Sequence, residues 1–317
     1  TLRTLHVRNC TGVKDCGKVV QAIACYTPHI EDLDLSKWKL DDNSLLVRSS
    51  FIEGTKEKEK EPETETEKEK GKDTEREKEQ EEESEVTIII EPEPTSFVDR
   101  CRSLRRLYLA YCSSLTDVAM VPLIRNQAKE RPVSVMEGRR PPRVGLRVLD
   151  LSRCSEIGNR TLTAIATYCS HPKKLYLAYC PSISEEGIDK VSENSNSARN
   201  LRVLNLRGIR SVHAPVLRLE GLVELCLSEC DKISDEHLKR AITPSHMIEK
   251  LKLSHTLISD ATLDHLALTC KGLRVLKASG CANISHPTLD LPNLAILVRA
   301  RPISCHLTYL FCTTGPS

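Results

Sequence analysis

Apolar and polar residues alternate in a short phrase that recurs along the chain. The phrase is Leu-x-x-Leu-x-Leu-x-x-Cys, and it is most complete at residues 104–112, 146–154 and 222–230. Its Leu-x-Leu core places apolar side chains at every second position, which predicts a short strand with one buried face. The first apolar position of each phrase is Leu2, Ile30, Leu104, Leu146, Pro172, Leu201, Leu222, Ile248, Leu273 or Leu294.

The phrases follow one another at a nearly constant spacing. Two steps are long, and the others are about 21 to 29 residues. A repeat of this length is typical of a solenoid, in which each unit buries its apolar face only against its neighbours. Such a molecule offers a partner an extended surface rather than one deep pocket.

A second phrase follows most strands and predicts a helix. It reads Ile233-Ser234-Asp235, with related versions at 115–117, 183–185 and 258–260. Ser or Thr suits a helix N-cap, and the acid suits the positive end of the helix. We therefore expect a curved, right-handed α/β solenoid with ten parallel strands on the concave face and helices outside. The leucines that we expect to be buried are Leu107, Leu109, Leu149, Leu151, Leu225 and Leu227.

The two phrases together resemble the cysteine-containing class of leucine-rich repeat. A further cysteine three residues before the phrase, as in Cys101 and Cys270, adds to the resemblance. The class is similar to the substrate-recognition part of F-box/leucine-rich-repeat proteins and to antagonist-of-mitotic-exit-like proteins. The resemblance implies that the concave face holds a target protein. For the F-box case it also implies a Skp adaptor and a cullin, bound through an N-terminal helical motif that this chain lacks.

Two insertions interrupt the repeats. Residues 54–96 begin as a run of Glu, Lys and Thr that cannot bury apolar surface, so we expect disorder, with a transient single helix as the alternative. The second insertion is a basic loop near 125–145. The expected organisation is N-terminal repeats at 1–53, the acidic insertion at 54–96, repeats at 97–293 and a degenerate end at 294–317. Because Thr1 already lies inside a phrase, we expect a fragment of a longer protein.

The distribution of charge and the number of cysteines indicate which cellular compartment and which partners to expect. The formal net charge of +2 conceals a net charge of −10 over residues 53–94, which carry 18 acidic and 8 basic residues, against +12 for the remainder. The 14 cysteines follow no regular pairing pattern, so we expect reduced thiols and a location in the cytoplasm or nucleus. No apolar run is long enough to span a membrane, and we expect no membrane partner.

The sequence offers little catalytic chemistry, and we expect no enzyme, cofactor or metal site. It has no Cys-x-x-Cys or His-x-x-x-His pair, and Cys226 and Cys230 are expected on opposite faces of a strand. His265 and Cys270 have no orienting acid at a fixed spacing. The cysteine that ends each phrase shares its position with Trp38, Ile209 and Thr256, which indicates packing rather than thiol reactivity.

Candidate binding residues come from positions that point outward from the strands. The residue between the last two leucines forms one column, and the positions that follow add Tyr and Arg, which are frequent interface anchors. The predicted partner-binding residues are Tyr108, Tyr111, Asp150, Arg153, Tyr176, Tyr179, Asn205, Arg207, Lys252, His255 and Lys277. For Tyr111 and Tyr179 the sequence leaves open a second interpretation, in which they pack over the strand edge between repeats.

Three functions are compatible with these sequence features. The first is the substrate-recognition region of an SCF-type ubiquitin ligase, and the second is a scaffold or regulatory binder with no ligase role. The third is a binder of anionic surfaces or nucleic acid, suggested by the basic repeats. We rank nucleic acid last, because few aromatic residues alternate with the bases and no nucleic-acid-binding motif is present.

Overall fold

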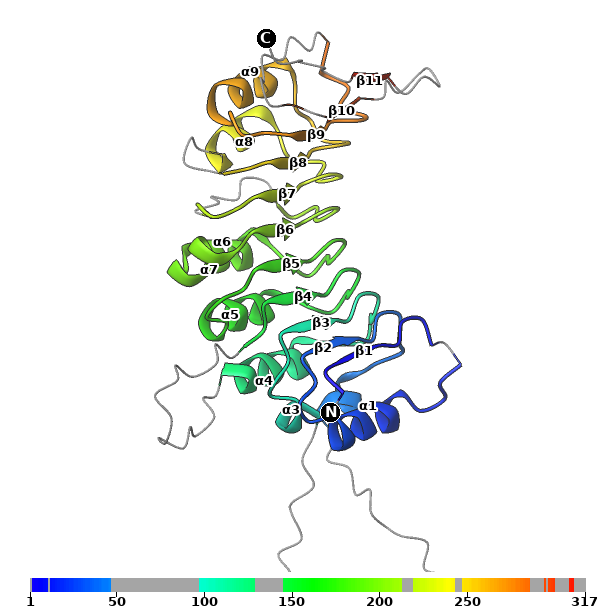
Figure 1. Ribbon diagram of the computed structural model, residues 1–317. Helices are drawn as coiled ribbons and strands as arrows, with labels where there is room; N and C mark the ends of the chain where they lie inside the picture. The colour runs from blue at the N-terminus through cyan, green and yellow to red at the C-terminus, as the bar shows by residue number, and fades with distance from the viewer. Residues whose placement is uncertain are drawn as a thin grey trace, which may run out of the picture.

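The structure is a computed structural model that describes residues 2–10, 12–46, 97–128, 145–212, 219–242, 247–285, 294, 296–299 and 308–310. The acidic insertion expected at 54–96 and most of the basic loop near 125–145 therefore lie outside the described residues. The remaining residues form one stack of repeats, which Figure 1 shows from the N-terminal end at the bottom to the C-terminal end at the top.

One sheet runs the length of the stack, with its strands in chain order. The strands are β1 (Thr4–His6), β2 (Asp32–Asp34), β3 (Arg106–Tyr108), β4 (Val148–Asp150), β5 (Lys174–Tyr176), β6 (Val203–Asn205), β7 (Glu224–Cys226), β8 (Lys250–Lys252), β9 (Val275–Lys277), β10 (Ile296–Arg299) and β11 (Thr308–Leu310). Each strand from β1 to β9 pairs in parallel with the next, so β1–β10 form one parallel series. The prediction of ten parallel strands, one per phrase, is thus confirmed.

The eleventh strand was not predicted. β11 pairs with β10 in the antiparallel direction, with Leu310 opposite Leu297. Thr308–Leu310 belongs to the tail and carries no leucine phrase, so the repeat pattern gave no signal for it.

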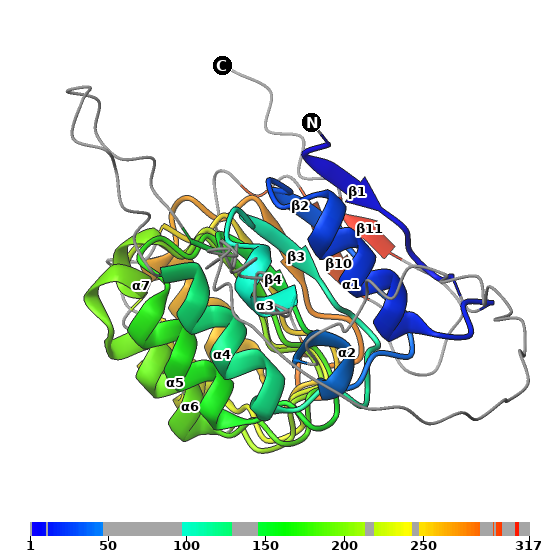
Figure 2. The same cartoon turned by 90° about the horizontal axis from the view of Figure 1, so that it is seen from below.

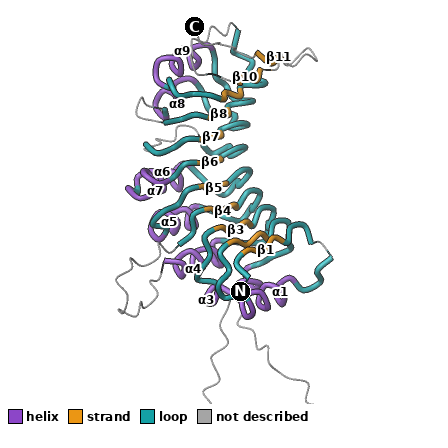
Figure 3. Tube along the Cα trace, in the orientation of Figure 1, coloured by secondary structure: helices purple, strands orange, loops and turns teal. Residues whose placement is uncertain are grey.

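Helices cover the side of the stack away from the strands. They are α1 (Cys16–Tyr26), α2 (Asp42–Leu46), α3 (Phe97–Arg100), α4 (Asp117–Ala128), α5 (Asn159–Tyr168), α6 (Glu185–Glu193), α7 (Ser195–Asn200), α8 (Asp235–Ala241) and α9 (Asp260–Thr269). Figure 2 shows α4, α5 and α6 side by side along one flank, and Figure 3 shows the same separation of helices from strands. The chain forms an α/β solenoid, as the phrases predict.

Two repeats show no helix among their described residues. These residues are 206–212 and 219–223 between β6 and β7, and 278–285 and 294 between β9 and β10. The other residues of both repeats lie outside the described part of the chain, so a helix in these repeats stays a prediction.

The leucines of the phrases form the core. Leu107, Leu109, Leu151, Leu225 and Leu227 have no exposed surface, and Leu149 is 4 % exposed. All six leucines named from the sequence are thus buried. Removal of a leucine side chain from water stabilises a fold by about 1.5–3 kcal/mol. The ladder of buried leucines therefore supplies much of the free energy that stabilises the solenoid.

The cysteines that end the phrases form a second ladder with a polar function. Each thiol donates to the carbonyl of the last leucine in the preceding repeat, from Cys112 to Leu35 (3.6 Å), Cys154 to Leu109 (3.1 Å), Cys180 to Leu151 (3.1 Å), Cys230 to Leu206 (3.2 Å) and Cys281 to Leu253 (3.1 Å). Trp38 occupies the same position, and its indole N–H donates to Val7 of the preceding repeat. Most residues at this position therefore combine apolar packing with a hydrogen-bond donor, whereas the buried Ile209 provides packing alone.

These thiols are buried and free, with one partial exception. Five of the six ladder cysteines are buried, whereas Cys10 is half-buried and donates to Val7 and Arg8 of its own repeat. Cys10 differs because β1 has a neighbouring strand on one side only among the described residues. Burial raises the pKa of Cys112 and of Cys230 to about 12 and that of Cys180 to about 11.

The acids at the helix starts connect one repeat to the next. The side chain of the first helical residue accepts hydrogen bonds from the residues that precede or begin the helix of the next repeat. These pairs are Asp42 with Thr116, Asp117 with Gly158 and Thr161, Asn159 with Ser184, and Asp235 with Ser259 and Thr262. Asp260 accepts in the same way from Ser285, which follows β9. The sequence predicted only the favourable position of an acid at its own helix N-terminus. The structure adds a bond across the repeat interface.

Candidate partner-binding surface

We define the strand face as the outward side of β1–β9. Its middle column is the residue between the last two leucines of each phrase, and the parallel register places these residues side by side. The column is His6, Asp34, Tyr108, Asp150, Tyr176, Asn205, Cys226, Lys252 and Lys277. Six predicted binding residues, Tyr108, Asp150, Tyr176, Asn205, Lys252 and Lys277, therefore lie in one row, and their role in binding stays a prediction.

Two half-buried tyrosines, Tyr108 and Tyr176, flank Asp150 near the middle of this row. Burial is the main cause that raises the pKa of Tyr108 and Tyr176, followed by the nearby carboxylates of Asp32 and Glu224 respectively. Burial also raises the pKa of Asp150, whose carboxylate accepts the backbone N–H of Ser152 at 3.0 Å. The rings are thus fixed on the sheet while part of each remains accessible.

The N-terminal end of the strand face neutralises its own charge. Asp32 and Asp34 are each only 5 % exposed. Asp32 lies 3.1 Å from His6 and 2.8 Å from Arg106, and Asp34 lies 3.0 Å from Arg8. A buried carboxylate is costly unless it is paired, and these pairings meet that need within the chain.

Asp32 and Arg106 belong to an outward column that our sequence analysis missed. This first column precedes the middle column by two residues and consists of Thr4, Asp32, Arg106, Val148, Lys174, Val203, Glu224, Lys250 and Val275. The two-residue period of a strand could have found it, because residues on both sides of the central leucine point outward.

The C-terminal end of the strand face carries excess positive charge. Lys252 pairs diagonally with Glu224 at 2.5 Å, whereas Lys250 and Lys277 are exposed. Lys277 has no ion-pair partner among the described residues. The two ends of the face therefore differ in charge although they share one backbone register.

A second row, which we name the turn ladder, lies where each strand turns toward its helix. Its members in chain order are Asn9, Lys37, Tyr111, Arg153, Tyr179, Gly208, Glu229, His255 and Gly280, and all have a positive φ between 58° and 70°. This conformation lets the backbone N–H bond to the next repeat, as from Tyr111 to Ser152 at 2.8 Å. Left-handed backbone costs a residue other than glycine about 1 kcal/mol or more, which the regular hydrogen bonds offset.

The side chains of the turn ladder stack on one another. Lys37 lies 5.5 Å from the ring centre of Tyr111, and Arg153 lies 5.2 Å from Tyr111 and 4.2 Å from Tyr179. The Tyr179 hydroxyl donates to Glu229 at 2.7 Å, and this bond is the first cause that lowers the pKa of Glu229. The interpretation in which Tyr111 and Tyr179 pack over the strand edge between repeats therefore describes their contacts.

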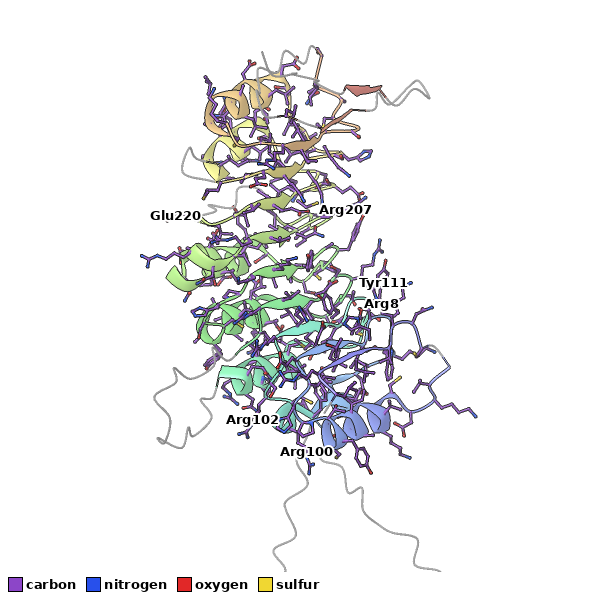
Figure 4. All side chains as sticks on the ribbon, in the orientation of Figure 1. Arg8, Arg100, Arg102, Tyr111, Arg207 and Glu220 are labelled. Atoms are coloured by element: carbon purple, nitrogen blue, oxygen red, sulfur yellow. The ribbon has the colours of Figure 1, made fainter. Side chains whose placement is uncertain are left out.

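Tyr111 and Arg207 nevertheless remain accessible on this edge. Tyr111 is 49 % exposed, and Arg207, two residues after Asn205 of the middle column, donates to Glu229 through Nε at 3.0 Å. Figure 4 places the labelled Tyr111 and Arg207 along the turns, on the side opposite the labelled Glu220. Stacking inside the chain does not remove these side chains from the surface.

Glycine interrupts the turn ladder where a ring leans on the next repeat. A Cβ added at Gly208 would lie 2.5 Å from the Tyr179 ring, and one added at Gly280 would lie 2.4 Å from the His255 ring. Both positions need glycine for the close approach of a ring as well as for the positive φ.

Hollows mark both sides of the stack. One of about 330 Å³ lies on the strand face and is lined by Arg207, Cys226, Ser228, Lys252, Ser254, His255, Lys277 and Ser279. Another of about 650 Å³ lies over α4 and α5, where Val118 is 62 % exposed. The first contains four of the predicted binding residues, and the second was not predicted.

The described part of the chain contains no group of three or more His, Cys, Asp or Glu residues that could hold a metal ion. Among its helices, none combines the length with the apolar character that crossing a bilayer requires.

The comparisons with known proteins give the fold but no family. No protein-family model matches the sequence, and no curated protein matches it either. Among solved structures, the chain is similar to one in the crystal structure of the Rad7 and Elc1 complex in yeast, with 14 % identity and a TM-score of 0.52. The similarity covers 94 % of this chain and 54 % of that chain, so this chain corresponds to about half of its structural neighbour. At this identity the likeness supports the solenoid fold alone.

Proposed function

We propose that this chain is a protein-recognition module that holds a partner protein along the strand face. The observation that carries the proposal is the middle column, in which Tyr108 and Tyr176 flank Asp150 in one register. Half-buried tyrosines offer a large contact area at a low cost in side-chain entropy, and such residues dominate many interfaces. The residues two positions after Tyr108, Asp150 and Tyr176 are small. They are Ala110, Ser152 and Ala178, and they leave room for a partner to approach.

We further propose that this module is the substrate-recognition region of an SCF-type ubiquitin ligase of the F-box kind. The support is the resemblance of the repeat phrases to F-box/leucine-rich-repeat proteins, together with a structural neighbour that was crystallised in a complex with another protein. In this proposal a Skp-type adaptor and a cullin bind a region outside this chain. The module acts inside the cell, in the cytoplasm or nucleus, and performs no catalysis itself.

The double substitution Tyr108→Ala and Tyr176→Ala tests the proposed face. We expect it to weaken partner binding by about 2 kcal/mol or more, because both rings leave the interface. The thermal midpoint should move little, since the core leucines lie on the other side of the sheet. Partner capture by immobilised protein, followed by mass spectrometry and an affinity measurement, provides the readout.

The matched control is Lys239→Ala and Arg240→Ala, which changes two exposed residues of α8 on the helix side. If this control loses the partner while the tyrosine variant keeps it, the strand-face assignment is wrong, and the helix side of the stack becomes the candidate surface. Co-purification of the longer protein with a Skp-type adaptor tests the ligase role separately from the binding face.

A further inference from the structure

The residues that directly precede β1–β9 form a row of their own, which we name the start row. From the second member on, the backbone N–H of each member donates to the carbonyl of the member before it, at 2.7–2.9 Å. Adjacent members are therefore about one strand spacing apart, roughly 4.8 Å. The start row is Arg3, Glu31, Arg105, Arg147, Lys173, Arg202, Val223, Glu249 and Arg274.

The two ends of the start row neutralise their own charge. Glu31 forms ion pairs with Arg3 at 3.1 Å and with Arg105 at 3.3 Å, and Glu249 lies 4.0 Å from Arg274. Side chains of this row thus reach one another across repeat boundaries. An acid in the row serves the cations of the repeats beside it.

The middle of the start row has four cations in succession and no acid. We name Arg105, Arg147, Lys173 and Arg202 the basic row; within two residues on either side of each, the chain contains no Asp or Glu. In the described part of the chain, Arg147 and Lys173 form no ion pair. The guanidinium of Arg202 is held by the carbonyls of two neighbouring residues, at 3.0 and 2.6 Å. Like charges on directly opposite positions of adjacent strands repel, so an anionic group along the basic row would stabilise it.

The acidic insertion re-enters the stack beside the basic row. The described chain resumes at α3 (Phe97–Arg100), and Arg105 follows this helix by five residues. The charge of the insertion is concentrated at the same end. Residues 55–78 carry ten acidic and eight basic residues, whereas residues 79–85, which we name the acidic run, carry five acidic residues and no basic one.

The length of chain between the two is sufficient for contact. The acidic run ends 12 residues before Phe97. A flexible chain of that length spans about 20 Å. The basic row extends over three strand spacings, about 14 Å. Such a tether gives the acidic run a local concentration on the order of millimolar at the basic row, which favours it over a free anion.

We propose that the acidic run of this chain binds along the basic row. The basic row lies at the starts of the strands, and the proposal does not depend on the function proposed for the strand face. The attached carboxylates are favoured over a nucleic acid, because the cations without acids beside them are confined to β3–β6. Exposed ion pairs contribute little to folding stability, so the association is measured by contact and by competition rather than by unfolding.

Carbodiimide cross-linking of the full chain tests the contact. The reagent joins a lysine amine to a carboxylate, and Lys173 is the exposed lysine of the basic row. We expect mass spectrometry of the monomer to find links between Lys173 and the acidic run. Their yield should fall at least about threefold in sodium chloride of about 1 M, where charges are screened beyond about 3 Å.

Two substitutions locate the contact without removing the reactive lysine. Arg147→Gln should lower the yield at Lys173 about two- to threefold, because a neighbouring cation is lost. Arg240→Gln, an exposed arginine of α8, removes the same charge elsewhere and should leave the yield unchanged. Absence of the link in the monomer overturns the proposal, as do equal yields in the two variants. A link found only in cross-linked dimers assigns the basic row to a second copy and also overturns it.

Competition tests whether the acidic run occupies the basic row. In one variant glutamine replaces the five glutamates of residues 79–85, and in its matched control glutamine replaces the five glutamates of residues 61–69. The first variant should bind a labelled polyglutamate peptide about tenfold more tightly than wild type, because the tethered competitor is lost. Fluorescence anisotropy measures the affinity, and an equal gain in the control would assign the effect to net charge and overturn the proposal. Single-stranded RNA is the second probe: if wild type binds it as tightly as the first variant does, the basic row is open in wild type and the acidic run is not its occupant.

Discussion

At the scale of single residues, the cysteine that ends each phrase acts as a buried hydrogen-bond donor. The carbonyl of the last leucine already accepts a backbone N–H of its own repeat, as Leu109 does from Cys112 at 3.2 Å. A carbonyl oxygen has two lone pairs, and the thiol of the next repeat fills apolar space and donates to the second. This explains why Cys predominates where Val or Ala would provide packing alone.

The substitution Cys154→Ala tests this role. We expect it to lower the free energy of unfolding by about 1–2 kcal/mol, because burial is lost and the Leu109 carbonyl keeps only the backbone N–H of Cys112 as a donor. Urea unfolding followed by circular dichroism measures the effect. Cys10→Ala serves as the control and should cost less, since Cys10 is half-buried. An equal cost at the two positions would contradict the role of the inter-repeat bond.

The buried thiols also predict a loss of stability at alkaline pH. Burial raises the pKa of Cys112 and Cys230 from 9.0 to about 12, so the folded state binds the thiol proton more tightly than the unfolded state does. The stability from this difference is complete below about pH 9 and is lost as pH rises toward 12. The free energy of unfolding measured between pH 8 and 11 should therefore fall, and it should fall less in the variant Cys112→Ala with Cys230→Ala. The same slope in both proteins would assign the effect to other groups.

At the scale of elements, the acids at the helix starts join adjacent repeats. Asp235 begins α8, yet its carboxylate accepts the backbone N–H of Ser259 at 2.8 Å and the hydroxyls of Ser259 and Thr262 near the start of α9. Burial alone would raise the pKa of Asp235, but these hydrogen bonds outweigh it and lower the pKa. The start of α9 is thus capped from the repeat before it, as are the starts of α4, α5 and α6.

Asp235→Ala should destabilise the C-terminal repeats by about 1–2 kcal/mol, the range for loss of a helix cap. The effect should appear first as faster hydrogen exchange in α9, which loses its cap, rather than in α5. Because the pKa of Asp235 is lowered, its contribution is present above the ordinary value of 3.8 and disappears as pH falls below it. Asp264→Ala, an exposed acid within α9, is the control, and equal effects of the two substitutions would count against capping across the interface.

The sequence predicts the strands, which depend on the spacing of leucines along the chain. It does not predict side-chain contacts between residues of different repeats. Leucine spacing gave the ten parallel strands, because a two-residue alternation has one structural solution when neighbours repeat it. It could not give the bond from Asp235 to Ser259 or the ring of Tyr179 over Gly208, because these join residues whose distance is set by the stacking of repeats. The middle column was predictable for the same reason as the strands, whereas the hollow required the positions of Ser228 and Ser254 in three dimensions.

At the scale of the whole molecule, the stack tolerates a large insertion between two neighbouring repeats. β2 and β3 pair in register, with Leu33 opposite Leu107, although the acidic insertion separates them in sequence. On the helix side, α2 and α3 pack against each other at the two points where the described chain ends and resumes. The interface between these repeats is therefore formed without the residues of the insertion that the structure leaves undescribed.

Deletion of residues 55–85 should leave unfolding cooperative and change its free energy by less than about 1 kcal/mol, because closure entropy varies slowly with loop length. Calorimetry and urea unfolding measure both quantities. Replacement of the same residues by a Gly/Ser linker of equal length separates the effect of length from that of composition. Loss of cooperativity in the deletion, but not in the linker variant, would show that the length of the segment is structural.

The succession of similar interfaces determines how the molecule would respond to a pulling force. Tension applied between its ends would load these interfaces in series, so the weakest would yield first and the others would follow in small steps. The chain would then lengthen step by step, as an elastic element made of repeats.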